Sequence, residues 1–185
     1  MRLPEGFHYQ PGVFDPATSA AHLAALLDAI AWERHEFHIY GRAVPMPRLI
    51  AMYGPVGYSY SGVEHPPRPF PPRVAAIRDR VEAVTARHFN SVLLNLYRDG
   101  RDGVSWHRDN DYAHGGQPDI ASVSFGATRR FQMRDDTGRL VEVALDPGSL
   151  LLVSGDALVR WWHRVPKTAR PVGPRVNLTF RHMVG

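Results

Sequence analysis

The sequence predicts a mainly β fold with flanking helices and a double-stranded β-helix, or jelly-roll, at its core. Two observations predict it. After residue 90, short apolar runs alternate with turn signals such as Asp99-Gly100, Gly115-Gly116 and Asp146-Pro147-Gly148, a pattern typical of many short strands. Before residue 90, two segments carry apolar residues at helical spacing, and we expect both helices to cover the outside of a sheet.

The two helices are predicted from their start signals and their apolar stripes. The first is expected to follow Thr18 or Ser19 as its N-cap, and the second to follow Pro71-Pro72. The stripe of the first is Leu23, Leu26, Leu27 and Ile30, and that of the second is Val74, Ile77, Val81 and Val84.

The length of the chain favours a single domain. A proline-rich connector at residues 66–72 is stiff, but too few residues precede it for a separate core. We therefore expect residues 1–185 to form one domain. Within it, approximately residues 1–90 would supply an N-terminal extension with helices and a hairpin, and residues 91–185 the jelly-roll core.

Composition narrows the functional classes. The chain has 44% hydrophobic residues and a net charge of +4, which favours a phosphate-rich partner. It has no cysteine, so disulfides and zinc-thiolate sites are excluded. The first residues lack an apolar leader segment, and no stretch approaches a membrane span, so we expect a soluble cytoplasmic protein without membrane contact.

Two groups of arginines are candidates for contact with a phosphate backbone, although solvated strand ends explain such groups as well. The groups are Arg98, Arg101 and Arg108, and Arg129, Arg130 and Arg134.

A histidine-aspartate pair and a distant histidine form a candidate metal site. His107 and Asp109 stand two residues apart, so on a strand both point to one side. His163 ends the apolar and aromatic segment 159–163, which we also interpret as a strand. Two histidines and one carboxylate leave coordination positions open, as in mononuclear iron oxygenases.

The segment 174–181 predicts an anion site. Alternation places Val176, Leu178 and Phe180 on one face, and the other face carries Arg175, Asn177, Thr179 and Arg181. Buried arginines are costly unless paired. A dicarboxylate reached by both long side chains would pair them. The alternative is a solvated strand face.

A similar alternation occurs in residues 90–100. It places Asn95 and Tyr97 opposite Leu94 and Leu96. Both polar groups could bond a keto acid, although an ordinary core strand with a tyrosine hydroxyl in water explains them too.

These segments together resemble the AlkB family of Fe(II)- and 2-oxoglutarate-dependent nucleic-acid dealkylases, and most of all its human-type DNA repair homologues. The motifs, in order, are F-N-S-V-L-L-N-L-Y, W-H-R-D-N-D, I-A-S-V-S-F-G-A, W-W-H-R-V-P and P-R-V-N-L-T-F-R, within roughly residues 37–182.

The resemblance implies that His107, Asp109 and His163 bind Fe(II), with O2 and 2-oxoglutarate as cosubstrates. It implies that Arg175 binds the distal carboxylate and that Arg181 lies nearer the iron. The implied 2-oxoglutarate site comprises Asn95, Tyr97, Arg175, Asn177, Thr179 and Arg181.

The resemblance also implies a site for a flipped base. Asp111, two residues beyond Asp109, would set a second carboxylate near the metal, which suits a cationic methylated base. Residues 36–48 resemble the family's lesion-recognition hairpin, whose apolar residues could wedge between base pairs. The implied substrate contacts are Tyr58, Tyr60, Asn110, Asp111, Arg48, Phe37, Ile39 and Tyr40.

The implied function is oxidative demethylation of 1-methyladenine and 3-methylcytosine in DNA, releasing formaldehyde, succinate and CO2. The partner would be alkylated single- or double-stranded DNA, with RNA also open, and the protein would act as a monomer, near the nucleoid if bacterial. An RNA, tRNA or protein demethylase is the alternative, because it would share every iron and cosubstrate residue. A non-catalytic iron-binding sensor is more distant.

Overall fold

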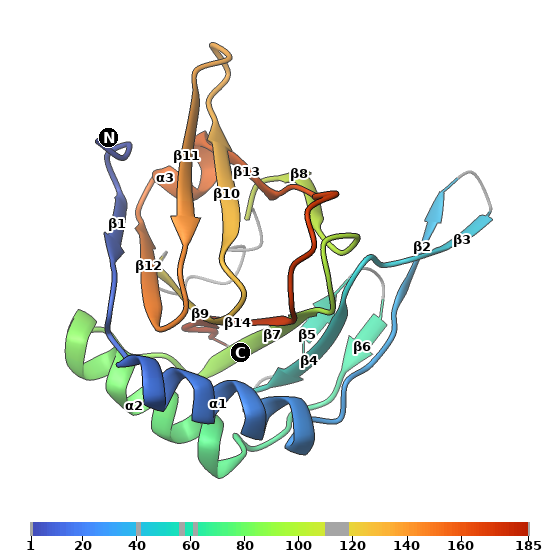
Figure 1. Ribbon diagram of the computed structural model, residues 1–185, viewed down its shortest axis with the longest axis vertical. Helices are drawn as coiled ribbons and strands as arrows, with labels where there is room; N and C mark the ends of the chain where they lie inside the picture. Colours follow the sequence, from blue (N-terminus) through green and yellow to red (C-terminus); the bar gives the residue numbers. More distant parts are fainter. Residues whose placement is uncertain (1, 40–41, 56–57, 61–62, 110–118, 185) are drawn as a thin grey trace.

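The computed structural model describes residues 2–39, 42–55, 58–60, 63–109 and 119–184, with the backbone alone at 37–39, 58–60 and 63–65. Its main chain forms two sheets that face each other, with two helices covering the outside of the larger sheet (Figure 1). The helices α1 (Pro16–Ala29) and α2 (Pro72–Thr85) form this outer layer. The predicted jelly-roll with flanking helices is confirmed.

The larger sheet contains six antiparallel strands in the order β1-β12-β9-β14-β7-β4. Its two edge strands, β1 and β4, come from the first 90 residues. The strands are β1 (Phe7–Gln10), β12 (Ser149–Ser154), β9 (Asp119–Gly126), β14 (Arg175–Arg181), β7 (Ser91–Tyr97) and β4 (Leu49–Tyr53).

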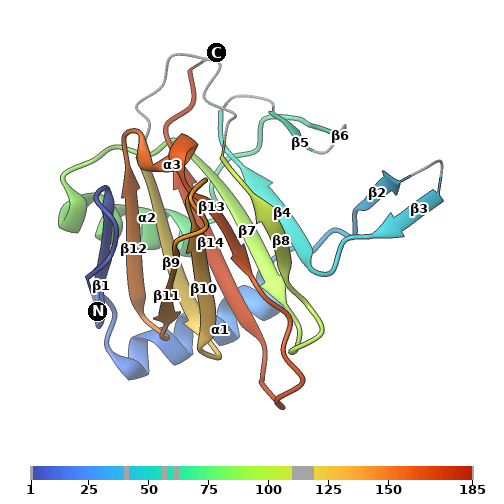
Figure 2. The same cartoon turned by 90° about the horizontal axis from the view of Figure 1, so that it is seen from above.

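The smaller sheet faces the larger one and has the strand order β11-β10-β13-β8 (Figure 2). Two hairpins, β2–β3 and β5–β6, complete the described strands, and the first projects away from the body of the protein in both views. The bounds are β11 (Leu140–Leu145), β10 (Arg129–Arg134), β13 (Trp162–Val165), β8 (Val104–His107), β2 (Glu36–Ile39), β3 (Arg42–Pro45), β5 (Tyr58–Tyr60) and β6 (Val63–His65).

The core has one layer on each side of the larger sheet. Between this sheet and the helices, Val176, Leu178 and Phe180 are fully buried against residues such as Leu26 and Ile77. A second apolar cluster, which includes Ile120, Met133, Leu145, Leu151 and Val153, lies mainly between the two sheets. The strands of the larger sheet are therefore covered on both faces, and a polar side chain on the inner face is enclosed.

The helices are as predicted except at the start of the first. Helix α1 begins at Pro16, because the Asp15 carboxylate accepts hydrogen bonds from the backbone N–H groups of Ala17 and Thr18. The predicted caps, Thr18 and Ser19, are wrong, since Pro16 is well suited to the first turn and places the cap one residue before it. The apolar stripes of both helices pack against the sheet as expected.

The segment 159–163 is only partly a strand. Residues Ala157–Arg160 form a short helix, α3, and β13 starts at Trp162. The apolar residues of this segment indicated burial correctly, since Trp161 is buried, but a short apolar run fits helix and strand equally well. The predicted strand is therefore wrong at residues 159–161 and confirmed at residues 162 and 163.

The buried side chain of His22 on α1 should make the stability of the fold depend on pH. Its ring is buried against Phe14 and Phe125, with centroids 5.3 and 5.1 Å away, and its Nδ1 has no hydrogen-bond partner among the described residues. Burial, aided by the charge of Arg73, lowers the pKa of His22 below its ordinary value of 6.5. The neutral ring thus stabilises the fold above pH 6.5, and this contribution is lost as the pH falls below that value.

We therefore expect the unfolding free energy of the native protein to fall more between pH 7.5 and pH 5 than that of a His22→Leu variant. Urea unfolding at the two pH values measures the difference. Equal losses in both proteins would show that His22 does not titrate on unfolding.

Candidate active site

A cavity of about 130 Å³ lies between the two sheets. Its polar wall comes from the inner faces of β7 and β14 and from the ends of β8 and β13. The polar residues around it include Arg48, Asn95, Tyr97, His107, Asp109, Ser122, His163, Arg175, Asn177, Thr179 and Arg181. Apolar side chains, including those of Ile120, Phe131 and Leu151, form the remainder. The cavity therefore brings together the predicted metal ligands and the predicted 2-oxoglutarate residues.

The three predicted metal ligands meet at one point. His107, the last residue of β8, pairs directly with His163 of β13, and their ring centroids lie 4.2 Å apart. The Nε2 of His163 is 3.4 Å from the Oδ2 of Asp109. One ligand atom from each residue lies within 4.8 Å of the other two. This is a donor set of two imidazoles and one carboxylate, which suits Fe(II) with open positions.

The geometry of the pair His107 and Asp109 differs from the prediction. Strand β8 ends at His107, so Asp109 lies beyond the strand rather than on its face. The pairing of β8 with β13 also shifts register between His163 and Val165, which is the signature of a bulge. The two ligands therefore converge through the irregular residues 108 and 109 after β8, and not through strand alternation.

His107 and Asp109 already have the protonation that a metal requires. The Nδ1–H of His107 donates to the Ser105 carbonyl at 2.9 Å, which leaves the Nε2 lone pair available. Burial, reinforced by His163, lowers the pKa of His107 to about 4, so the ring is neutral at pH 7. Burial alone would raise the pKa of Asp109, but Arg181 and the two histidines outweigh it and hold that pKa well below its ordinary value.

Phe131 contributes to the metal site without being a ligand. Its ring stacks on that of His163, with an interplanar angle of 28° and centroids 5.4 Å apart. The stacked contact restricts the rotation of the imidazole, because the two ring faces pack against each other. Sequence reasoning missed this residue, whose side-chain direction depends on the pairing of β10 with β13.

The predicted alternation on β14 is confirmed. Arg175 is buried, and its Nη2 donates to the Ser124 hydroxyl at 2.8 Å. Its Nε and Nη1 have no hydrogen-bond partner within the part of the chain that the structure describes. Arg181, at the other end of the strand, donates to Asp109 Oδ1 at 3.0 Å. The two arginines therefore lie at opposite ends of the cavity, with Arg181 beside the metal ligands.

The amide side chains between them are partly fixed by neighbours. Asn95 and Asn177 pair across β7 and β14. Asn95 accepts from Arg48 Nε at 2.8 Å, and Asn177 donates to the Ser122 hydroxyl and the Val123 carbonyl. Thr179 donates to Asn177 at 3.4 Å. These contacts orient polar groups along the cavity wall.

Two serines of β9 were not predicted as site residues. Ser124 binds Arg175 and Ser122 binds Asn177, each through its hydroxyl. The signal was present in residues 119–126, where alternation places both serines on one face and Val123 with Phe125 on the other.

The predicted substrate residues are only partly described. Arg48 is buried and lines the cavity. Within the predicted hairpin segment 36–48, β2 and β3 pair as antiparallel strands, with Glu36 opposite Pro45 and Ile39 opposite Arg42. Its role in lesion recognition stays a prediction. Phe37 and Ile39 lie on β2, and Tyr58 and Tyr60 on β5, but their side chains are outside the description. Tyr40, Asn110 and Asp111 lie outside the described residues altogether.

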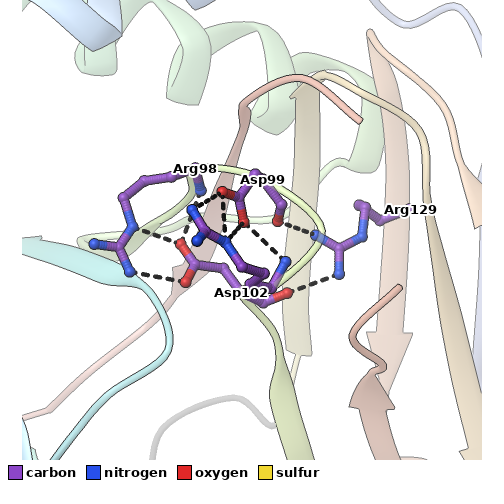
Figure 3. A network of polar contacts seen from close by, with 5 residues as sticks. Arg98, Asp99, Asp102 and Arg129 are labelled. Carbon is purple, nitrogen blue, oxygen red and sulfur yellow. Dashed lines mark hydrogen bonds and ion pairs between the residues drawn. The ribbon is translucent and has the colours of Figure 1, made fainter. Parts of the chain in front are cut away.

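The two predicted arginine groups are not uniform surface patches. Arg98 forms two hydrogen bonds with the Asp102 carboxylate through its side chain (Figure 3). Arg101 pairs with Asp99. Arg108 pairs with Asp136 and stacks on Trp162. Arg130 and Arg134 are exposed, but Arg129 is buried. Its prediction as a surface residue is wrong, because its guanidinium points inward to backbone carbonyls.

Comparison with known proteins identifies the family. The 2OG-Fe(II) oxygenase superfamily matches this chain over residues 6–181. The chain belongs to this superfamily. Fe(II) and 2-oxoglutarate, with O2, are therefore its cofactor and cosubstrates, as predicted, and the donor set of His107, Asp109 and His163 fits the metal.

The relatives place this oxygenase in the AlkB family, as the sequence predicted. It is 38% identical to alpha-ketoglutarate-dependent dioxygenase alkB homolog 3 of Homo sapiens over 182 residues, covering 92% of this chain and 64% of that protein. It is 39% identical to DNA oxidative demethylase ALKBH2 of Homo sapiens over 157 residues, covering 79% and 60%. The chain thus spans less than two thirds of the length of these relatives.

A solved structure supports the fold. The structure of OsALKBH1 superposes with a TM-score of 0.73 at 15% identity and covers 98% of this oxygenase and 100% of the solved chain. At that identity the likeness concerns the fold alone. In the part of the oxygenase that the structure describes, no helix is long and apolar enough to cross a bilayer.

Proposed function

We propose that this oxygenase demethylates 1-methyladenine and 3-methylcytosine in DNA. The observation that carries the proposal is the enclosure of the His107, Asp109 and His163 cluster in one cavity with an arginine, Arg175, whose Nε and Nη1 have no hydrogen-bond partner among the described residues. The choice of DNA is supported by the similarity to proteins named DNA oxidative demethylase.

In this proposal the cavity holds iron at one end and the distal carboxylate of 2-oxoglutarate at the other. His107, Asp109 and His163 bind the metal, and Arg175 binds the distal carboxylate. Arg181 lies beside the metal ligands. The remaining proposed 2-oxoglutarate residues line the same cavity, and they are Asn95, Tyr97, Asn177 and Thr179. A dianion placed there would offer acceptors to the Nε and Nη1 groups of Arg175.

The side chains around the cavity set the charge state and orientation of the metal ligands. When bound, Fe(II) with 2-oxoglutarate and O2 supplies the oxidation that hydroxylates the N-methyl carbon, after which formaldehyde, succinate and CO2 leave. Arg181 keeps Asp109 ionised, and the Ser105 carbonyl keeps the His107 tautomer fixed. The apolar part of the cavity, including Ile120 and Leu151, limits the entry of water.

The proposed substrate is a base that carries a positive charge. Methylation at N1 of adenine or N3 of cytosine blocks the pairing edge, so the damaged base costs less to flip out of the duplex. We place Asp111 near this base, with Asn110, Tyr58 and Tyr60, as the family resemblance implies. Arg48 is the contact of this set whose side chain the structure describes at the cavity wall.

The projecting hairpin β2–β3 is the proposed contact with the neighbouring bases. It stands clear of the two sheets (Figure 2), and Val44 on it exposes 40% of its surface. An exposed apolar side chain on a projecting hairpin suits insertion between base pairs. Val44 of β3 thus joins Phe37, Ile39 and Tyr40, the wedge candidates that the family resemblance implies, as a fourth candidate.

The test is a demethylation assay on matched oligonucleotides. Purified protein with Fe(II), ascorbate and 2-oxoglutarate is incubated with single- and double-stranded DNA and with RNA, each carrying 1-methyladenine or 3-methylcytosine. We expect mass spectrometry to show loss of one methyl group from DNA, dependent on 2-oxoglutarate. Demethylation of RNA alone would overturn the choice of DNA, and succinate formation without demethylation of any oligonucleotide would overturn the proposed substrate.

A further inference from the structure

Behind the cavity, a second buried guanidinium accompanies that of Arg175. Arg129, the first residue of β10, is 3% exposed. Its guanidinium carbon lies 5.6 Å from the centre of the Tyr97 ring, and that of Arg175 lies 5.1 Å from the same centre. Tyr97 and Arg175 line the cavity, whereas Arg129 is not among the lining residues. Both guanidinium groups therefore pack against the ring of Tyr97.

Among the described residues, the hydrogen bonds of Arg129 go to backbone carbonyls and not to a carboxylate. Its Nη2 donates to the carbonyls of Asp102 and Pro166, at 2.8 and 2.7 Å, and its Nη1 donates to the carbonyl of Asp99 at 3.2 Å. Figure 3 shows the guanidinium pointing toward the loop that contains both aspartates. Carbonyl groups satisfy the donors of an arginine, but they carry no net charge to neutralise it.

The two nearby carboxylates are already engaged. Asp102 is bound by the side chain of Arg98 (Figure 3). Asp99 is bound by the side chain of Arg101. Their charges act favourably on Arg129, but each is shared with an arginine of its own. Arg129 and Arg175 together therefore leave an excess of positive charge at the end of the cavity away from the metal ligands. Such charge is unfavourable in a buried place unless an anion enters.

We propose that Arg129 is a positioning residue that makes the cavity select a dicarboxylate. It would do so by adding a second positive charge behind Arg175 and by holding Tyr97 against it. The inference rests on the proposed placement of the distal carboxylate of 2-oxoglutarate at Arg175. A 2-oxo acid without that carboxylate would leave both arginines facing an uncharged methyl group. The long-range attraction then favours the dianion specifically.

A purely structural role is the competing explanation. Arg129 connects the turn at residues 99–102 to Pro166, which precedes the loop leading to β14. Losing these bonds would loosen both loops. A loosened pocket should weaken every 2-oxo acid to a similar degree, whereas a lost charge should weaken only ligands with a distal carboxylate.

The test compares two ligands of equal chain length. Calorimetry on the Mn(II)-loaded protein measures the dissociation constants of 2-oxoglutarate and of 2-oxopentanoate, which has a methyl group in place of the distal carboxylate. For Arg129→Met we expect about tenfold weaker binding of 2-oxoglutarate, a change of ~1.4 kcal/mol, and less than a twofold change for 2-oxopentanoate. Equal weakening of both ligands, or of neither, would overturn the inference.

Two further variants secure the result. Arg129→Lys keeps the charge but loses the forked hydrogen bonds, so we expect it to keep most of the preference for 2-oxoglutarate even if Arg129→Met does not fold. Loss of the preference in Arg129→Lys would contradict the role of charge. Arg130→Met is the matched control, because Arg130 is the exposed neighbour on the same strand and pairs with Glu142 at 3.6 Å. It should bind both ligands as the native protein does.

The same titrations separate this inference from the proposed site. If the native protein does not prefer 2-oxoglutarate, or if Arg175→Met keeps the preference, the placement of the distal carboxylate is wrong. If Arg175→Met removes the preference while Arg129→Met keeps it, the site stands and the role of Arg129 is overturned.

Discussion

His107→Ala is expected to abolish turnover and to weaken metal binding by about 100-fold or more, because removing even a residue that only supports a metal ligand costs 10- to 100-fold. Only Asp109 and His163 would remain of the cluster. Calorimetric titration with Mn(II) measures the loss of affinity, and formaldehyde release measures the loss of turnover. The fold should persist, because the neutral imidazole of His107 forms only one hydrogen bond, to the Ser105 carbonyl, among the described residues.

The control for this variant is His88→Ala. The His88 side chain is 90% exposed, and its Nδ1 lies 3.6 Å from the Glu82 carboxylate. Removing this side chain should change neither metal binding nor turnover. Undiminished Mn(II) affinity in His107→Ala, in a folded protein, would remove His107 from the metal site and with it the assignment of the cluster.

Arg175→Met is expected to weaken 2-oxoglutarate binding by about 30- to 100-fold, or ~2–3 kcal/mol, the value of hydrogen bonds to a charged group. Methionine fills similar space without the charge. Metal binding should stay unchanged, because Arg175 lies at the opposite end of β14 from Arg181, which donates to the metal ligand Asp109. Calorimetry with 2-oxoglutarate and with Mn(II) measures the two affinities separately.

Stability gives an independent check on Arg175. A buried arginine whose Nε and Nη1 have no hydrogen-bond partner among the described residues is a cost to the fold in the absence of an anion. Thermal unfolding without ligand should therefore show Arg175→Met to be as stable as the native protein or more so. Arg78→Met, on the surface helix α2 and stacked on Phe70, serves as control. A large loss of stability in Arg175→Met would indicate that the arginine supports the fold rather than a ligand.

The sequence predicted the site residues on β14 and β7 correctly because each strand has an apolar face opposite the face that lines the cavity. Val176, Leu178 and Phe180 fix the orientation of β14, and Leu94 and Leu96 fix that of β7. A one-residue shift would bury the wrong face, so the alternation determines where Arg175 and Asn95 point. The spacing of apolar residues likewise predicted the buried faces of the two helices. It did not identify the N-cap of α1, because several polar residues near the start of the helix could have served as the cap.

The parts that were missed depend on contacts between distant segments. Arg129 is buried because carbonyls of the loops after β7 and β13 converge on it, and no local pattern reveals such convergence. Phe131 reaches His163 only through the pairing of β10 with β13. Asp109 lies beyond the end of β8 in an irregular segment, so strand alternation predicted the correct pair of ligands but not the way in which they meet.

The placement of the metal and the cosubstrate in one cavity is tested most directly by a crystal structure of the protein with Mn(II) and 2-oxoglutarate. Anomalous scattering locates the metal independently of any interpretation of the ligand. We predict a single strong peak bound by His107, Asp109 and His163, with the distal carboxylate of 2-oxoglutarate on Arg175. A metal peak away from these three residues, or a distal carboxylate that does not contact Arg175, would contradict the proposed site.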